Sequence, residues 1–199
     1  MTASATHYDD PVEVPALMQG WKPALSESIG AFIARIDSFY LGTADATGQP
    51  YIQHRGGPPG FLRVIDRRTL AFADFSGNRQ YVSVGHLATN SKAFLFLMDY
   101  ERRQRVKIYG TARVTNDPAL LRATSVDGYD ADVERAIVFD VGAWTANCPQ
   151  HIPRRYAEAT VDAQTVALRA RVAELEAENA RLRSKPPARC PPKTLCQPD

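Results

Sequence analysis

The sequence of 199 residues lacks several features that would decide its class at once. It has three cysteines, an odd number, and two of them (Cys190, Cys196) lie in a proline-rich tail, so no disulfide framework is expected. No apolar run approaches the roughly 18 residues that cross a bilayer, and the N-terminus shows no secretory signal pattern. We therefore expect a cytoplasmic protein that has no membrane partner.

The common catalytic and metal-binding motifs are also missing. There is no P-loop, no paired-cysteine zinc motif and no nucleophile elbow. The four histidines (His7, His54, His86, His151) lack ligand spacing, so no metal site is predicted. The net charge of +2 is too small to indicate nucleic-acid binding by itself. Between Asp45 and Gly110, however, ten Lys and Arg stand against five acids, which indicates either a small anionic ligand or a solvated basic face.

What the sequence does contain is a series of short segments rich in aromatic and β-branched residues. They are separated by hairpin-length connections such as Asp45–Gly48 and Ile65–Arg68. This spacing predicts an α+β, mainly β domain over residues 25–155, whose antiparallel sheet closes as a barrel because LFLM and AIVF are expected to be buried on both faces. Helices are predicted over 26–37, over 78–89 and after Asp117-Pro118, where Asp can cap and Pro can begin a helix.

The two ends of the chain have a different character. Residues 1–24 are predicted to be an arm, and residues 184–199, with five prolines, a disordered tail. Residues 156–183 predict a coiled-coil helix, and its single Asn179 is typical of parallel two-stranded coils. The seam of this helix is Val161, Thr165, Leu168, Val172, Leu175, Asn179 and Leu182. The alternative is a terminal helix that packs back on its own barrel.

Two segments within the domain could contact a ligand. Asn78, Arg79 and Gln80 follow the strand TLAFADF, where a helix start could hold an anion or be a plain N-cap followed by a surface arginine. The segment HRGGPPG at 54–60 allows close backbone approach to a flat ligand or forms a rigid turn.

Two further groups of side chains are candidates. Arg105 and Lys107 share one face of a strand by its period of two, and that face could line a ligand site or be exposed. A last loop contains an aromatic ring, two amides, a thiol and an imidazole within eight residues. Such a mixture is more typical of a functional loop than of a loop that is only structural. Those residues are Trp144, Asn147, Cys148, Gln150 and His151. Trp144 could instead belong to the core, and Cys148 could be an inert thiol.

The order of these segments resembles the pyridoxamine 5′-phosphate oxidase-related flavoproteins, which have the FMN-binding split-barrel fold. The resemblance is carried over about residues 29–155 by GQPYIQHRGG, TLAFADFSGNRQY, AFLFLMDYERRQRVKIYGTARV and AW…NCPQHI. In that family FMN lies at the interface of a dimer of barrels. The resemblance therefore implies a homodimer that binds FMN and a small-molecule substrate.

The resemblance also assigns roles to individual residues. His54, Arg55 and Gly56 would run along the flavin ring, Ala73 and Asp74 would lie beside the ring and ribityl chain, and Asn78, Arg79 and Gln80 would hold the phosphate. Arg105 and Lys107 would reach the ring edge. The segment from Trp144 to His151, with Asn147 and Gln150, would be lent by the partner chain, and His151 or Cys148 would contact the substrate.

The chain departs from the pyridoxamine phosphate oxidases proper at three positions. Those enzymes carry an arginine where Gln53 stands, a lysine near Pro58 and a lysine where Gln80 stands. The resemblance therefore implies a flavin-dependent oxidoreductase with a different substrate, which transfers a hydride between NAD(P)H or a small organic molecule and the flavin. A flavin- or haem-binding carrier or sensor without turnover, and a deazaflavin-dependent reductase, are the alternatives.

Overall fold

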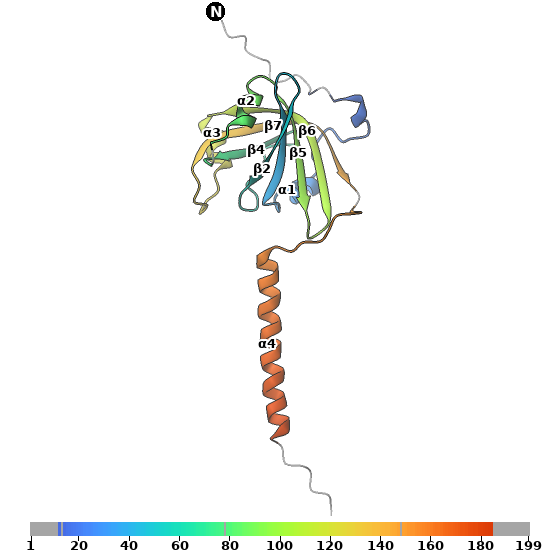
Figure 1. Ribbon diagram of the computed structural model, residues 1–199, viewed down its shortest axis with the longest axis vertical. Helices are drawn as coiled ribbons and strands as arrows, with labels where there is room; N and C mark the ends of the chain where they lie inside the picture. The colour runs from blue at the N-terminus through green and yellow to red at the C-terminus, as the bar shows by residue number, and fades with distance from the viewer. Residues whose placement is uncertain (1–11, 13, 78, 148, 185–199) are drawn as a thin grey trace, which may run out of the picture. The chain divides into compact units, whose positions relative to one another are not determined.

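The computed structural model describes residues 12, 14–77, 79–147 and 149–184, and the chain divides after Arg154 into two compact units (Figure 1). The first unit contains the sheet and the short helices, and the second contains one long helix. In chain order the elements are η1 (Ala16–Met18), α1 (Glu27–Ile33), β1 (Ser38–Ala44), β2 (Pro50–Gly56), β3 (Arg63–Val64), β4 (Thr69–Phe75), α2 (Val82–Leu87), β5 (Lys92–Asp99), β6 (Gln104–Thr115), α3 (Pro118–Thr124), β7 (Val133–Asn147) and α4 (Glu158–Arg183).

The strands form one antiparallel sheet in the order β2-β1-β5-β6-β7-β4-β3. In the described part of the chain, β2 and β3 are its two edges. Burial alternates along β6, as expected for a strand with one face on the core. The segment AIVF of β7 is buried on both faces, as predicted. For LFLM of β5 the same prediction is wrong, because Phe96 and Met98 are only half-buried while Leu95 and Leu97 are fully buried.

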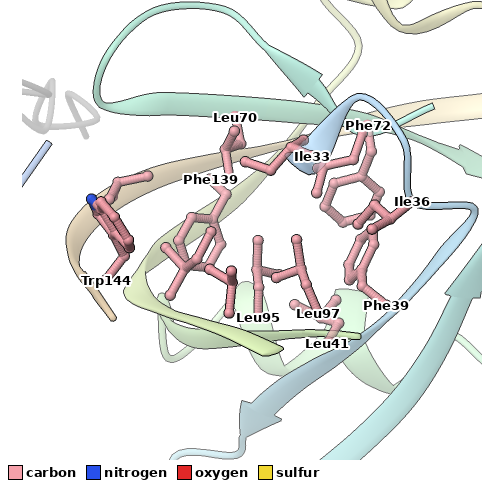
Figure 2. Close-up of a cluster of buried hydrophobic side chains, with 14 of the residues drawn as sticks. Ile33, Ile36, Phe39, Leu41, Leu70, Phe72, Leu95, Leu97, Phe139 and Trp144 are labelled. Carbon is pink, nitrogen blue, oxygen red and sulfur yellow. The ribbon is translucent and has the colours of Figure 1, made fainter. Parts of the chain in front are cut away.

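The core lies inside the curve of this sheet, where side chains of α1 fill it (Figure 2). Ile33 of α1 is fully buried, and Phe39 packs its ring against Phe61 and Phe72 at centroid distances of 5.5 and 5.0 Å. Burial of such aromatic side chains is a large part of what holds a small sheet in its curved form. The chain thus forms the predicted barrel around one core.

A glycine in β6 lets two strands approach where the sheet bends. The pairing of β6 with β7 shifts register between Tyr109 and Gly110. A Cβ atom at Gly110 would lie 2.0 Å from the carbonyl oxygen of Asp140, so no other residue fits this backbone without movement. Such irregularities increase the bend and twist of a strand.

The local signals at two turns behave as predicted. Asp45 accepts hydrogen bonds from the backbone N–H and the hydroxyl of Thr47 at 2.8 and 2.7 Å, and Gly48 has φ of 91°. These bonds lower the pKa of the Asp45 carboxyl, and the bond from the Thr47 hydroxyl has the largest effect. At the start of α3, the Asp117 carboxylate accepts from the N–H of Ala119 at 2.7 Å.

Two helix predictions are wrong in their extent. The first helix ends at Ile33 instead of 37, and Ser26 stands at its N-cap position without a side-chain capping bond, since its hydroxyl lies 2.9 Å from that of Ser28. The second begins at Val82 instead of 78, because Arg79 has φ of 56°, a left-handed conformation that a helix cannot include.

Candidate ligand site

A small pocket of about 50 Å³ opens where β2, the end of β4 and the start of α2 meet. Four residues that the sequence analysis singled out separately line it together: Arg55, Asp74, Arg79 and Gln80. The other lining residues are Gln53, Phe75, Gly77, Tyr81, Ser83 and Val84. The structure therefore brings together two motifs that are about 20 residues apart in the sequence.

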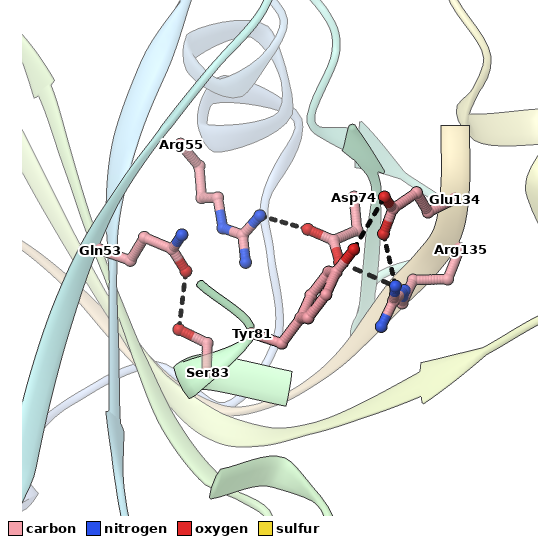
Figure 3. A network of polar contacts seen from close by, with 7 residues as sticks. All are labelled: Gln53, Arg55, Asp74, Tyr81, Ser83, Glu134 and Arg135. Carbon is pink, nitrogen blue, oxygen red and sulfur yellow. Dashed lines mark hydrogen bonds and ion pairs between the residues drawn. The ribbon is translucent and has the colours of Figure 1, made fainter. Parts of the chain in front are cut away.

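Arg55 and Asp74 of the pocket belong to a network of polar contacts that extends beyond the lining residues (Figure 3). Arg55 donates to Asp74, whose other oxygen lies 3.5 Å from Nε of Arg135. Arg135 also pairs with Glu134, which accepts a hydrogen bond from the Tyr81 hydroxyl at 3.0 Å. The Arg55 and Asp74 side chains are 13% and 6% exposed, so water screens this ion pair little.

The charges around the pocket do not cancel. Arg55 and Arg135 are balanced by Asp74 and Glu134, and Arg79 adds a further positive charge at the rim. In addition, Nε of Arg55 is buried and has no hydrogen-bond partner among the described residues. Because buried donors are almost always satisfied in native proteins, this nitrogen points to an acceptor that a ligand or water would supply.

Neutral polar groups complete the other side of the pocket. Ser83 is 1% exposed, and its hydroxyl donates to Oε1 of Gln53 at 2.9 Å (Figure 3). Since this bond uses the acceptor end of the Gln53 amide, its NH₂ end is the part that can donate to another group. The pocket therefore offers guanidinium and amide donors, which are the groups that bind anions.

Arg79 does not line this pocket from the first turn of a helix, where the sequence placed the possible anion site. Helix α2 has six residues and begins three positions after Arg79. Arg79 lies instead in the connection from β4, with its backbone in the left-handed region. Its side chain lines the pocket through that turn. Asn78, the third residue of this motif, lies outside the described residues.

The other face of β2 belongs to a second, apolar surface. Tyr40, Gly42, Ile52, Phe94 and Phe96 line an open groove of about 510 Å³ on the outer face of β1, β2 and β5. Ile52 is 69% exposed there and Tyr40 is 40% exposed. Large exposed apolar surfaces of this kind mark binding sites more often than ordinary solvent-facing surface.

His54, Arg105 and Lys107 share this outer face, as the period of the strands requires. His54 is paired with Tyr40 and their rings are 5.7 Å apart, while Lys107 is paired with Phe96 across β5 and β6. The Arg105 guanidinium lies 5.9 Å from the Phe96 ring, and its Nε is buried without a partner among the described residues. The predicted site is thus divided between two faces of one sheet.

Trp144 belongs to the core, which is the alternative that the sequence left open. Its side chain is 3% exposed, and its indole N–H donates to the carbonyl of Ala24 at 2.8 Å. Burial leaves this side chain no accessible face, so Trp144 itself offers no side chain to a ligand. That the segment from Trp144 to His151 is lent to a partner's pocket stays a prediction. Ala73 is also buried, at 3% exposed.

The glycines of the loop after β2 serve packing. A Cβ atom on Gly57 would lie 2.8 Å from the Phe61 ring, so close approach at this loop is to a core side chain. Gly56 pairs with Ser38 in the sheet and lies against the His54 ring. For residues 54–60 the sequence left two possibilities, a close backbone approach to a flat ligand and a rigid turn. These packing contacts favour the rigid turn.

The loop that follows β7 is held in place by an arginine from the neighbouring hairpin. Arg103 donates from Nε to the carbonyl of Ile152 and from its terminal nitrogen to that of Pro149, both at 3.1 Å. Gln150 and His151 lie on this loop and are exposed, and His151 has φ of 60°. Neither lines the pocket described above. Asn147 pairs with Arg105 through the backbone at the end of β7, and Cys148 lies outside the described residues.

Sequence reasoning missed Tyr81, Ser83, Glu134 and Arg135. Arg135 stands opposite Asp74 in the register of β4 and β7, a pairing across about 60 residues that no local pattern reveals. The one available signal was the pair Glu134-Arg135 directly before the apolar run AIVF. Among the described residues, no three His, Cys, Asp or Glu side chains are grouped to hold a metal ion. No helix of that part of the chain is long and apolar enough to cross a membrane.

Comparison with protein families gives one match that covers most of the chain. The sequence profile described as "Pyridoxamine 5′-phosphate oxidase" matches residues 25–179. A search of curated proteins found no match.

Solved structures of similar fold are distant in sequence. HupZ of Group A Streptococcus is 18% identical, with a TM-score of 0.52 over 66% of this chain and 99% of that one. A single-residue variant of HupZ gives 18% identity and a TM-score of 0.51 over 61% and 98%. An FMN-binding protein from Syntrophomonas wolfei is 14% identical, with a TM-score of 0.44 over 61% and 90%.

Proposed function

Because the chain belongs to the pyridoxamine 5′-phosphate oxidase family, with its antiparallel split β-barrel, we propose that it is an FMN-dependent oxidoreductase. The proposed reaction transfers a hydride between NAD(P)H or a small organic substrate and the flavin. The observation that carries the proposal is the pocket between β2 and α2. Its lining contains two arginines, Arg55 and Arg79, against one acid, Asp74, and the Nε of Arg55 is left without a partner among the described residues.

The residues of this pocket fit the phosphate end of FMN. A phosphate monoester carries up to two negative charges and accepts hydrogen bonds through three oxygens. Arg79 at the rim would supply a charge-assisted donor, and Gln53 and Gln80 would supply neutral amides. The pocket is too small for a tricyclic ring, which supports its assignment to the phosphate.

The outer face of β1, β2 and β5 fits the flat ring. Its groove is apolar and about ten times larger than the pocket, at about 510 Å³ against 50 Å³. Because β2 is an edge strand of the described sheet, one ligand that crosses this edge could reach both surfaces. His54, Arg105 and Lys107 lie on the same face as the groove and would meet the polar edge of the ring.

The proposal includes a homodimer whose interface holds the cofactor. Ile52, at 69% exposed, and Tyr40 lie beside the groove, so a second barrel would cover apolar surface that one chain leaves open. The loop with Gln150 and His151 is exposed and fixed by Arg103, and it would be the segment presented to the partner's site.

When bound, FMN supplies the hydride chemistry, and the chain supplies binding, orientation and electrostatics. Positive charge from Arg105, near the outer face, would stabilise negative charge on a reduced ring. Arg55 would act at a distance, because its guanidinium is already paired with Asp74. His151 and Cys148 remain proposed contacts for the substrate.

Titration with FMN and with riboflavin, which lacks the phosphate, tests the phosphate site. We expect FMN to bind more tightly than riboflavin, and Arg79→Ala to raise the FMN Kd about 10- to 100-fold while it leaves the riboflavin Kd nearly unchanged. Arg122→Ala is the matched control, because it removes the same charge from an exposed position on α3. Flavin fluorescence quenching measures each Kd.

Three outcomes of these experiments would contradict the proposal in different ways. No quenching by either flavin would exclude flavin binding, and equal Kd values for the two would exclude a phosphate site. Flavin-loaded protein that NAD(P)H does not reduce, and that no acceptor in a panel reoxidises with turnover, would be a carrier or sensor. Mass spectrometry of the released chromophore distinguishes FMN from a deazaflavin or haem.

A further inference from the structure

Helix α4 carries a regular apolar seam that the proposed function does not use. Its 26 residues run from Glu158 to Arg183, about 39 Å at the usual rise, and none of them is buried. We propose that α4 pairs in parallel with α4 of a second copy of this chain to form a two-stranded coiled coil. This proposal is independent of the flavin and concerns only how two chains are joined.

The seam follows a heptad repeat in which leucine recurs every seventh residue. Leu168, Leu175 and Leu182 occupy the d positions together with Val161, and Thr165, Val172 and Asn179 occupy the a positions. In the single chain these apolar side chains are exposed, from 41% at Leu175 to 66% at Leu168. Pairing with another helix along this seam would remove them from water.

The residue types at the two seam positions favour two strands. β-Branched residues at a with leucine at d favour a two-stranded coil over three or four strands. Here Thr165 and Val172 are β-branched at a, and three of the four d residues are leucine. The third a residue, Asn179, is the polar one.

Asn179 also selects the direction of the partner. In a parallel pair each a residue faces its own copy, so Asn179 would meet Asn179 of the partner subunit and the two amides can hydrogen-bond. In a fully overlapped antiparallel pair, a positions face d positions. Asn179 would then lie against Val161 of the partner subunit, and a buried amide would lose its hydrogen bonds.

The flanking charges are complementary in the parallel arrangement. Each g residue lies near the e residue of the following heptad on the other helix. Arg171 at g would meet Glu176 of the partner subunit, and Glu178 at g would meet Arg183 of the partner subunit. By two-fold symmetry each pair occurs twice. No like charges face each other at these positions.

The charged side chains at the g positions can leave their contacts within one helix and pair with a partner helix instead. In the single helix Arg171 pairs with Glu174, and Glu178 lies 3.8 Å from Arg181. These side chains are between 52% and 72% exposed. Because exposed pairs three residues apart contribute little to stability, they do not hold either residue away from a partner helix.

Disulfide trapping in the full chain tests the pairing and its direction. In a background with Cys148, Cys190 and Cys196 replaced by Ser, Leu168→Cys places a thiol on the seam. Val166→Cys is the matched control, because Val166 lies two residues away at an outer b position and both side chains are 66% exposed. Both variants are equilibrated in glutathione buffer and the covalent dimer is quantified.

We expect the Leu168→Cys chain to form about ten times more covalent dimer than the control, since the seam holds the two thiols in contact. Addition of Leu175→Lys to the same chain should abolish that excess, because a charge would enter the seam. A dimer formed by the barrels alone would raise the amount of covalent dimer equally in both variants, so comparison with the control removes this contribution.

Two results would overturn the proposal. Equal cross-linking of Leu168→Cys and Val166→Cys would mean that this face does not meet a second helix, as would happen if α4 packed on its own barrel. Cross-linking of Asn179→Cys chains with Val161→Cys chains, but not with themselves, would mean an antiparallel pair, in which two copies of residue 179 lie about 27 Å apart.

Discussion

Arg55 joins the structural and the ligand-binding parts of the site in one side chain. Its terminal nitrogen neutralises Asp74, which is 6% exposed, and its Nε is buried without a partner among the described residues. The ion pair with Asp74 stabilises the fold, and the unpaired Nε is a donor available to a ligand. A loss of Arg55 should therefore affect stability as well as binding.

We expect Arg55→Ala to lower the free energy of unfolding by about 2 to 3 kcal/mol, because it leaves the Asp74 carboxylate buried with Arg135 as its remaining cation. Urea unfolding measures the change. The double variant Arg55→Ala/Asp74→Asn should lose less than the single variant, since the buried charge is gone. A double variant that is less stable by the sum of the two single losses would contradict this coupling.

At the residue scale, the sequence identified the cationic half of the site. Arg55, Arg79 and Gln80 could be singled out because they lie in recognisable motifs at or after strand ends, and Asp74 because the family resemblance assigned it a role. The structure places all four around one pocket. Arg135 could not be found, because its contact with Asp74 depends on the register between β4 and β7. Trp144 could be read either way, because an aromatic residue at a strand end is equally compatible with core and loop.

At the element scale, strands were easier to predict than helices. A strand such as β6 shows its period of two over twelve residues, and the predicted antiparallel arrangement is confirmed. Helices α1 and α2 are only seven and six residues long, so their sequence periods are incomplete and tertiary contacts decide where they end. The left-handed backbone at Arg79 had no signal of its own, because it is not a glycine.

The bend between β6 and β7 yields a prediction at this scale. Gly110→Ala should destabilise the fold by at least about 3 kcal/mol, since the added carbon would lie 2.0 Å from a carbonyl oxygen of β7. Gly30→Ala on α1 is the control, because nothing lies within 4 Å of its Cβ position, and it should stabilise the fold by about 0.5 to 1 kcal/mol. Thermal unfolding compares the two. A Gly110→Ala protein as stable as the parent would mean that the strands separate here at little cost.

At the scale of the whole molecule, the chain consists of a folded unit with its own core and a helix that contributes nothing to that core. The core cluster is made of residues between Leu25 and Trp144, and no residue of α4 is buried. Heptad spacing indicated the helix from the sequence alone. The sequence could not show which partner covers its seam, because that depends on a second chain.

A chain that ends at Arg154 should therefore keep the fold of the first unit. We expect a single cooperative urea transition with a free energy of unfolding within about 1 kcal/mol of the full chain at the same protein concentration. Near-UV circular dichroism, which reports the packing of core aromatics such as Phe39 and Trp144, should be retained. Loss of the cooperative transition would mean that the sheet depends on α4.

The two hydrogen bonds from Arg103 to the carbonyls of Pro149 and Ile152 have a consequence for assembly. They restrict the segment with Gln150 and His151 before any second subunit arrives. The conformational entropy of this segment is thus lost during folding of the single chain and need not be lost again on association. The segment is preorganised, so its contribution to a subunit contact would appear mainly as a slower dissociation rate.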